Sequence, residues 1–384
     1  MGIHEDMLVL TEEIGPRGAT TAAEGRAARY IRKRLEERGI QASTKEFFTI
    51  NTYSYLYVIY LLATALSGLL SYWFPYYAAP VALACATLFA LDLETYPLLS
   101  SIMPRRLSRN VVGEIPSEDG KVGLVLVAHY DSARASLSFH PRMVRGFRFS
   151  FQLMVWAVFA TAALTVSNLI LRVTLGYANL GVWIATLLTS CYLLVPVAVM
   201  LHRERYMAYT PGANDNASGV ATMLALADKM SEEESLTPGV MFVATGAEEV
   251  GTVGMLEFVR EHGERIRDAM IINLDNLGRG HLCYIDCEGM LAPRRADPVL
   301  LWLAGKVVER KRLPVFRTSY RLLSTDATPA LARGFRAMSV MAFDDDGTLP
   351  NWHWKTDTLE NVNIQNLETA RAFVWNIARR LDLP

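Results

Sequence analysis

Four stretches without a charged residue set the strongest limit on how this chain can fold. A helix needs about 20 apolar residues to cross the hydrocarbon core of a bilayer, where its backbone must satisfy its own hydrogen bonds. Core helices of soluble proteins seldom run that far without a charge. With 51% hydrophobic residues in the chain, we predict four transmembrane helices at Tyr53–Phe74, Pro75–Leu91, Phe149–Leu171 and Leu180–Leu201.

The predicted helices form two hairpins that interrupt a charged, soluble part of the chain. Short turns, one beginning at Pro75 and one between Arg172 and Asn179, join the helices of each pair. Because each hairpin starts and ends in soluble sequence, the flanking segments must lie on one side of the membrane. We predict hairpins at 53–103 and 149–201, and one discontinuous soluble domain formed by 1–52, 104–148 and 202–384.

Basic residues indicate which side of the membrane that is. Three basic clusters flank the hairpins toward the soluble domain, whereas the turns between helices offer only Arg172. Positive charge gathers on the cytoplasmic side of membrane helices, so we expect a multi-pass protein of the cell membrane with a cytoplasmic soluble domain. The clusters are Arg105, Arg106 and Arg109; Arg142, Arg145 and Arg148; and His202, Arg203 and Arg205.

Net charge and cysteine usage exclude other classes of protein. A net charge of −1 argues against a nucleic-acid partner, and lipid headgroups explain the arginine clusters better. Two of the four cysteines, Cys85 and Cys191, fall inside predicted helices, which does not suggest a disulfide framework. Cys283 and Cys287 are better explained by strand packing than by a zinc site. No cleavable signal peptide is visible in residues 1–50.

Short apolar runs alternate with helical patterns in the soluble part. The runs predict buried strands at Lys121–Ala128, Met241–Thr245, Met270–Leu274 and Ser339–Phe343. The helical patterns cover Val220–Met230, Val250–His262, Pro298–Lys311 and Ile364–Arg380. This alternation predicts an α/β domain with a mainly parallel mixed sheet and helices on both faces.

Side chains that bind metals stand where these strands end. Most of them directly follow one of the first three strands; one lies ten residues beyond the fourth, and one just precedes a helix. In open α/β sheets, ligands bind outside the carboxyl ends of the strands, and imidazole and carboxylate groups are zinc ligands. The residues are His129, Asp131, Asp215, Glu248, Glu249, Asp275 and His353.

These segments, taken together, resemble the zinc-dependent exopeptidases of the bacterial leucyl aminopeptidase and aminopeptidase S type. That family also includes glutaminyl cyclases. The resemblance runs in order through Thr20–Ile50, Asn110–Ser132 and Gly212–Leu383. It implies the zinc exopeptidase fold, which is phosphorylase/hydrolase-like, and two zinc ions per chain.

The resemblance also implies a role for each residue of the set. Two zinc ions about 3.5–4 Å apart can share a hydroxide and polarise a peptide carbonyl, and a carboxylate beside them can carry the proton. A metal-bound His often donates its other N–H to a carboxylate. The roles implied are His129 and Asp275 on one zinc, Glu249 and His353 on the other, Asp215 as the bridge, Glu248 as general base, and Asp131 fixing the ring of His129.

Two segments depart from the family pattern. Many relatives have Ser-Asp-His where this chain reads Ser324-Thr325-Asp326-Ala327, so the histidine is absent here. The substrate pocket is therefore not assigned, and Tyr320 is a guess for the group that stabilises the oxyanion. In the last motif a bulky Trp354 follows His353.

The function we predict is a membrane-embedded dinuclear zinc aminopeptidase whose metal-bound hydroxide attacks the N-terminal peptide bond. One alternative is an enzyme like glutaminyl cyclase with a single zinc. Another is an amidohydrolase of N-acylated or lipidated amino acids, because a membrane-associated substrate would suit the location. A receptor or scaffold is disfavoured, since all five ligand positions and Glu248 are present.

Two acidic segments are open to more than one interpretation. Asp92 and Glu94 lie at membrane depth if the second span continues to Met103, where ionisable groups are usually functional. We favour a span that ends at Leu91 and leaves both at the interface. The run Asp344–Asp346 is best explained as a solvated loop, with a cationic substrate group as the alternative.

Overall fold

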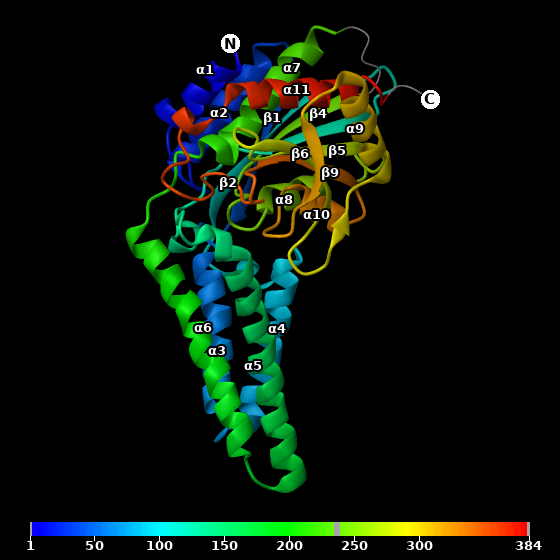
Figure 1. Ribbon diagram of the computed structural model, residues 1–384. Helices are drawn as coiled ribbons and strands as arrows, with labels where there is room; N and C mark the ends of the chain where they lie inside the picture. Colours follow the sequence, from blue (N-terminus) through cyan, green and yellow to red (C-terminus); the bar gives the residue numbers. More distant parts are fainter. Residues whose placement is uncertain (1, 234–238, 382–384) are drawn as a thin grey trace. The chain divides into compact units, whose positions relative to one another are not determined.

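The computed structural model describes residues 2–233 and 239–381, so the predicted resemblance up to Leu383 ends just outside the described part. The chain divides into two compact units (Figure 1). Unit 1 contains Met1–Asn51, Pro104–Ala135 and Tyr209–Pro384, and unit 2 contains Thr52–Met103 and Ser136–Ala208. The division into a catalytic domain and two transmembrane hairpins stays a prediction.

Unit 1 is built on a nine-stranded mixed sheet. Its order is β1-β2-β4-β3-β5-β9-β6-β7, with β8 paired to β6. The strands are β1 (Gln41–Thr49), β2 (Arg106–Ile115), β3 (Val122–His129), β4 (Gly239–Thr245), β5 (Met270–Leu274), β6 (His281–Glu288), β7 (Arg294–Arg295), β8 (Val315–Ser319) and β9 (Arg336–Phe343).

The sheet is mixed, as predicted, but less parallel than the sequence suggested. The central strands β4, β3, β5 and β9 run parallel, and β8 runs parallel to β6. The pairs β1–β2, β2–β4, β6–β7 and β6–β9 are antiparallel. Two successive antiparallel pairings give β1 the direction of β4. The carboxyl ends of β1, β3, β4, β5 and β9 therefore lie at one edge of the sheet.

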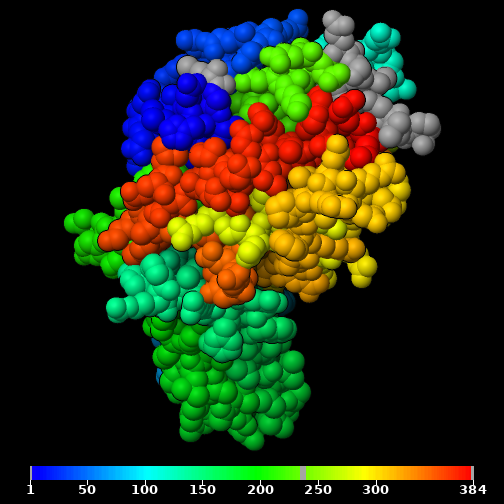
Figure 2. Space-filling view, turned by 45° about the horizontal axis from the view of Figure 1, so that its top comes forward, coloured from blue at the N-terminus to red at the C-terminus, as the bar shows by residue number. Residues whose placement is uncertain are grey.

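Helices cover both faces of this sheet, as predicted. Along β3, Leu124 and Leu126 face one core cluster and Val125 and Val127 face another, because successive strand residues point to opposite faces. The first cluster is closed by α1 (Ile3–Leu8), α2 (Ala22–Glu36), α7 (Ser218–Ser231), α9 (Pro298–Lys311) and α11 (Ile364–Ala378). The second is closed by α8 (Val253–His262) and α10 (Ala327–Ala332). In Figure 2, α11 crosses the visible face of unit 1 between α1 and α9.

Local signals explain where several of these helices begin. The Thr21 side chain accepts a hydrogen bond from the Glu24 backbone N–H, which caps α2. Asp297 does the same for α9 by accepting from the N–H groups of Val299 and Leu300. Pro298 then occupies the first helical position, where its missing N–H costs nothing.

Unit 2 consists mainly of four apolar helices that lie side by side (Figure 1). They are α3 (Ser54–Leu70), α4 (Pro75–Leu93), α5 (Phe147–Leu175) and α6 (Leu180–Tyr206). Within residues 2–233 and 239–381, three regions are long and apolar enough to cross a membrane, and they contain α4, α5 and α6. The helix α3 is equally apolar in character but has only 17 residues. The fourth predicted span therefore stays a prediction.

Aromatic side chains gather at the turns of unit 2. The rings of Trp73 and Trp183 lie 5.3 Å apart, and Tyr72 contacts both. Trp183 also donates its indole N–H to the carbonyl of Leu69 at 2.9 Å. Such amphipathic rings are typical of the boundary between lipid and water.

Two residues near helix ends in unit 2 have partners that the sequence did not predict. The helix α4 ends at Leu93, two residues beyond the predicted end of the span at Leu91, so Asp92 lies within its last turn and accepts a hydrogen bond from Tyr60. An interface location for Asp92 and Glu94 stays a prediction. Arg203 is buried. It donates to Thr52 and Ser54 and stacks on Tyr53, because the end of α6 packs against the start of α3.

Candidate metal centre

The structure brings all five predicted metal ligands together at the carboxyl edge of the sheet in unit 1. His129 is the last residue of β3, and Asp275 directly follows β5. Glu249 lies in the loop between β4 and α8, Asp215 in the segment before α7, and His353 in the loop after β9. All five side chains are buried.

The two oxygens of the Asp215 carboxylate face different histidines. Oδ1 lies 3.1 Å from Nε2 of His129, and Oδ2 lies 3.0 Å from Nε2 of His353. His129 Nε2 also lies 3.6 Å from Asp275 Oδ1, and His353 Nε2 lies 3.2 Å from Glu249 Oε2. The ligand set therefore divides into two halves that share Asp215.

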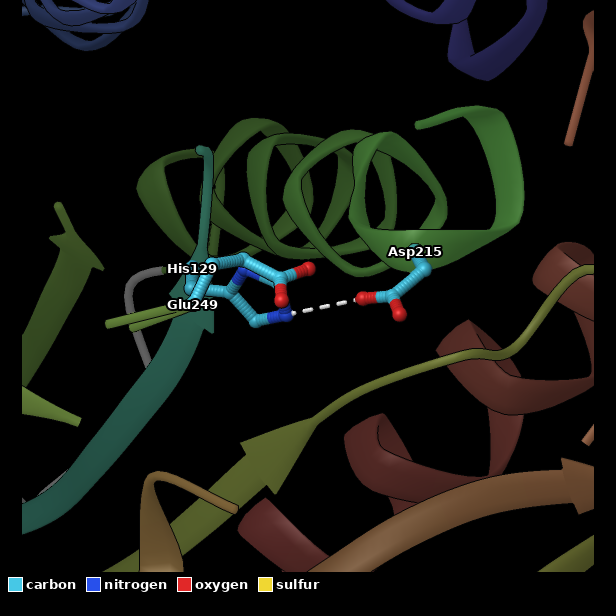
Figure 3. A group of neighbouring side chains, drawn as sticks. All are labelled: His129, Asp215 and Glu249. Atoms are coloured by element: carbon cyan, nitrogen blue, oxygen red, sulfur yellow. Dashed lines mark ion pairs between the residues drawn. The ribbon is translucent and has the colours of Figure 1, made fainter. Parts of the chain in front are cut away.

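Three of these side chains lie close enough together to hold a single metal ion. One ligand atom each from His129, Asp215 and Glu249 lie within 4.8 Å of one another. Figure 3 shows these three side chains, from β3, the start of α7 and the β4–α8 loop, converging on one space. Glu249 also keeps one buried oxygen, Oε1, that has no hydrogen-bond partner among the described residues. A buried carboxylate oxygen of this kind fits a cation.

The backbone conformation near the predicted ligands orients their side chains. Asn276 and His353 have φ angles of +52° and +47°, in the left-handed region that non-glycine residues seldom adopt. Asp357 fixes the segment of Asp215, because its two oxygens accept from the N–H groups of Asn214 and Asp215 at 2.6 and 3.2 Å. The predicted His-x-x-x-Asp motif thus supplies one ligand and one carboxylate that holds another ligand's backbone.

Asp131 contacts more than the histidine that we expected it to orient. Nδ1 of His129 lies 3.2 Å from the backbone oxygen of Asp131 and 3.6 Å from its Oδ1. The Asp131 carboxylate instead accepts the backbone N–H groups of Glu248 and Glu249 at 3.0 and 3.1 Å. It therefore links the loop of the predicted base to the end of β3.

Glu248 and Glu249, for which different roles are predicted, differ in their surroundings. Glu249 is buried among ligands, whereas Glu248 is half-buried. Burial and the neighbouring carboxylates, against the opposing charge of His129, raise the pKa of Glu248 well above its usual value. A group that must exchange protons near neutral pH benefits from such a shift.

The histidines and carboxylates of this centre shift one another's pKa values. Burial disfavours the charged form of His129, but Glu248 and the hydrogen-bonded carboxylates outweigh it and raise its pKa. The same balance raises the pKa of His353. Burial opposes ionisation of Asp215, yet both histidines outweigh it and lower that pKa. Divalent metal and protons must therefore compete for this site.

Several residues of the site carried no clear signal in the sequence. Glu24 is buried and accepts from Ala247 N–H, Ser108 and Thr20 N–H, so it holds the other end of the loop that carries Glu248. Burial and the charge of Asp131 raise its pKa to about 8. Sequence patterns do not reveal this role, because two of its partners lie 84 and 223 residues away in the sequence.

The departing segment Ser324–Ala327 contributes a buried carboxylate. Thr245 donates a hydrogen bond to Asp326, whose Oδ1 has no partner among the described residues. Burial raises the pKa of Asp326 to about 7. Tyr320, the guess for oxyanion stabilisation, is buried, and burial together with Asp275 raises its pKa well above the usual value. Its phenol is therefore protonated and able to donate.

Two other motifs lie away from the metal ligands. Asp345 pairs with His281 on the surface at 2.7 Å, which agrees with a solvated loop for Asp344–Asp346. Cys283 and Cys287 are buried on β6 and free, as expected from strand packing.

Comparison with known proteins identifies relatives of this chain. Residues 197–378 match the family model described as Peptidase family M28. The probable lipoprotein aminopeptidase LpqL of Mycobacterium tuberculosis is 26% identical over 182 residues, which cover 40% of this chain. The match covers 36% of LpqL, so the chain spans about a third of that relative's length.

Solved structures share the fold. The zinc aminopeptidase BSAP of Bacillus subtilis has a TM-score of 0.57 at 15% identity, covering 98% of this chain and 94% of BSAP. The glutaminyl cyclase of Porphyromonas gingivalis has a TM-score of 0.55 at 12% identity, covering 99% of this chain and 97% of the cyclase. The predicted resemblance to zinc-dependent exopeptidases is confirmed.

Proposed function

We propose that this chain, of which residues 197–378 match the model of Peptidase family M28, is a membrane-embedded aminopeptidase with two zinc ions per chain. The placement of Asp215 carries the proposal, since each of its oxygens faces a different histidine at 3.0–3.1 Å. A carboxylate in this position suits a bridge between two metals. His129 and Asp275 would hold one zinc, and Glu249 and His353 the other.

Each catalytic role falls to a residue whose surroundings suit it. Zinc bound at this site would activate a water molecule and polarise the carbonyl of the scissile bond. Glu248 accepts the proton of the attacking water and returns it to the leaving amine. Asp131 holds the backbone of Glu248 while leaving its side chain free to face substrate. Tyr320 is our candidate donor to the oxyanion.

The membrane location rests on unit 2. The apolar lengths of α4, α5 and α6 and the aromatic cluster at their turns support insertion into a bilayer. The excess of arginines flanking the helices supports a cytoplasmic catalytic domain. A peptide or amide substrate associated with the membrane would suit this location.

The test is metal content together with the product formed by the detergent-purified protein. We expect two zinc ions per chain and release of unblocked N-terminal amino acids from a peptide library. One zinc per chain with conversion of N-terminal glutamine to its cyclic form would instead identify a glutaminyl cyclase. Cleavage confined to N-acylated or lipidated amino acids would identify an amidohydrolase. No turnover on any of these substrates would contradict all three functions.

A further inference from the structure

Arg17 is a buried cation close to the metal ligands that the zinc mechanism does not use. Its side chain is fully buried, and no carboxylate is hydrogen-bonded to it among the described residues. Burial lowers its pKa to about 10, which leaves it charged at neutral pH. A buried charge is costly unless it is well solvated by the protein, so each of its contacts matters.

Backbone carbonyls take the place of water around this guanidinium. Nε donates to Tyr130 at 2.6 Å, Nη1 to Pro211 at 2.6 Å and to Leu10 at 3.3 Å, and Nη2 to Gly212 at 2.7 Å. The Arg17 backbone adds a pair of hydrogen bonds with Ser132. A planar guanidinium donates hydrogen bonds from three nitrogens in fixed directions, whereas a lysine ammonium donates from a single nitrogen.

The carbonyls belong to the two segments that carry metal ligands. Tyr130 directly follows His129, and Pro211 and Gly212 lead into Asp215. Ser132 also joins these segments, since its hydroxyl donates to the carbonyl of Thr210 at 2.9 Å. Arg17 therefore connects the backbone at His129 to the backbone at the bridging carboxylate, although 81 residues separate Tyr130 from Pro211 in the sequence.

Two glycines show how closely the chain approaches at this point. Gly212 has a φ angle of +65°, and a Cβ there would lie 2.6 Å from Ser132 Cβ and 3.2 Å from Arg17 Nη2. A Cβ on Gly18 would lie 2.0 Å from the ring of Tyr209, over which the Arg134 guanidinium stacks at 4.3 Å. The segments that pack around Arg17 thus leave no room for added atoms.

We propose that Arg17 is a positioning residue of the metal centre, which sets the spacing of His129 and Asp215 through the carbonyls of Tyr130, Pro211 and Gly212. Its positive charge also offsets the surrounding carboxylates Asp357, Asp131, Asp215 and Glu249. The inference rests on the proposed function, because it concerns the same metals. Removal of the guanidinium should weaken metal binding before any effect on substrate is considered.

The test compares Arg17→Lys with wild type by zinc affinity and by the absorption spectrum of the cobalt-substituted protein. Arg17→Lys keeps the positive charge but loses the planar guanidinium that donates from three nitrogens. We therefore expect zinc affinity to fall about tenfold or more and the cobalt spectrum to change. Arg26→Lys is the matched control, because exposed Arg26 also donates to a carbonyl, that of Ile14, and should bind zinc like wild type.

A second variant covers the case in which Arg17→Lys does not fold. Gly212→Ala adds a Cβ close to Arg17 Nη2, so it disturbs the same contact from the side of the acceptor residue. It should weaken zinc binding in the same way. Wild-type affinity and spectrum in the folded variants would overturn the inference. The proposed function fails separately, if wild-type protein binds fewer than two metals or releases no amino acids.

Discussion

The carboxylates at this centre fall into two groups. Some would coordinate metal, and others accept hydrogen bonds from backbone N–H groups. Asp131, Glu24 and Asp357 all accept N–H groups from loops that carry the active side chains. Asp215 and Glu249 instead direct oxygens toward histidines. Residue type alone could not separate these roles, because the partners are distant in sequence. The family resemblance predicted which side chains lie together, but not the backbone contacts of Asp131.

Glu248→Gln should abolish turnover and leave metal content unchanged, because it removes a proton acceptor and no ligand. Glu249→Gln should lose about one metal per chain, since it weakens one half of the ligand set. The two changes are isosteric and adjacent, so each serves as the control for the other. Metal analysis and peptide hydrolysis on the same preparations check this, and exchanged phenotypes would show that the roles are assigned the wrong way round.

Asp215→Asn should be the most damaging ligand change, because one side chain faces both histidines. We expect loss of both metals or of their fixed separation, with activity falling at least a hundredfold, about 2.7 kcal/mol in transition-state stabilisation. Asp275→Asn touches only the His129 half and should retain one metal. Two bound zincs and near-normal activity in Asp215→Asn would rule out a bridge.

At the scale of elements, apolar periodicity predicted the central strands well, but it predicted some strand ends and the short helices poorly. Strand β5 and helix α9 begin and end at the predicted residues; polar Asp275 follows β5, and Pro298 begins α9 directly after its cap, Asp297. Strand β9 starts at Arg336, three residues before the predicted Ser339, since its pairing with β5 extends to Arg336. Short helices such as α1 and α10 have six residues each, too few for a periodic signal.

Gly68 in α3 offers a test of packing inside unit 2. A Cβ there would lie 2.2 Å from Ser190 Oγ of α6 and 2.8 Å from Thr161 Cγ2 of α5, so the helix backbones approach closely. Gly68→Val should lower the stability of the detergent-solubilised protein by about 1–3 kcal/mol through overpacking. Gly146→Ala, where nothing lies within 4 Å of the new Cβ, is the control. Equal thermal unfolding of both variants would contradict the close packing.

For the whole molecule, the pKa shifts predict that metal and pH act together on stability. In the folded protein, Glu24, Asp326 and Asp357 have pKa values of about 8, 7 and 8, which are above their values in the unfolded chain. Their contribution to the free energy of unfolding is therefore lost as pH rises through the folded pKa values. The raised pKa values of His129 and His353 act in the same direction. Asp215, with its lowered pKa, is ionised throughout this range and adds no slope.

Chelator-treated protein should therefore lose stability between pH 5 and 8, and added zinc should raise the melting temperature more at pH 8 than at pH 5. Zinc replaces the protons that the histidines hold, so its apparent affinity grows as those protons leave. Thermal unfolding with and without zinc across this range is the measurement, with magnesium as the control ion. A zinc effect that is constant or larger at pH 5 would contradict proton competition at the site.

Membrane orientation is the property of the whole molecule for which the sequence gives the clearest prediction. Arg172 is the lone basic residue near the turns between helices, whereas clusters flank the other helix ends. Moving those arginines across a bilayer is unfavourable, so the turn at Gly176–Asn179 should face outward. In a variant without native cysteines, exposed Tyr177→Cys should react with a membrane-impermeant thiol reagent in intact cells. Glu118→Cys, exposed in unit 1, should react only after permeabilisation, and the reverse pattern would place the catalytic domain outside.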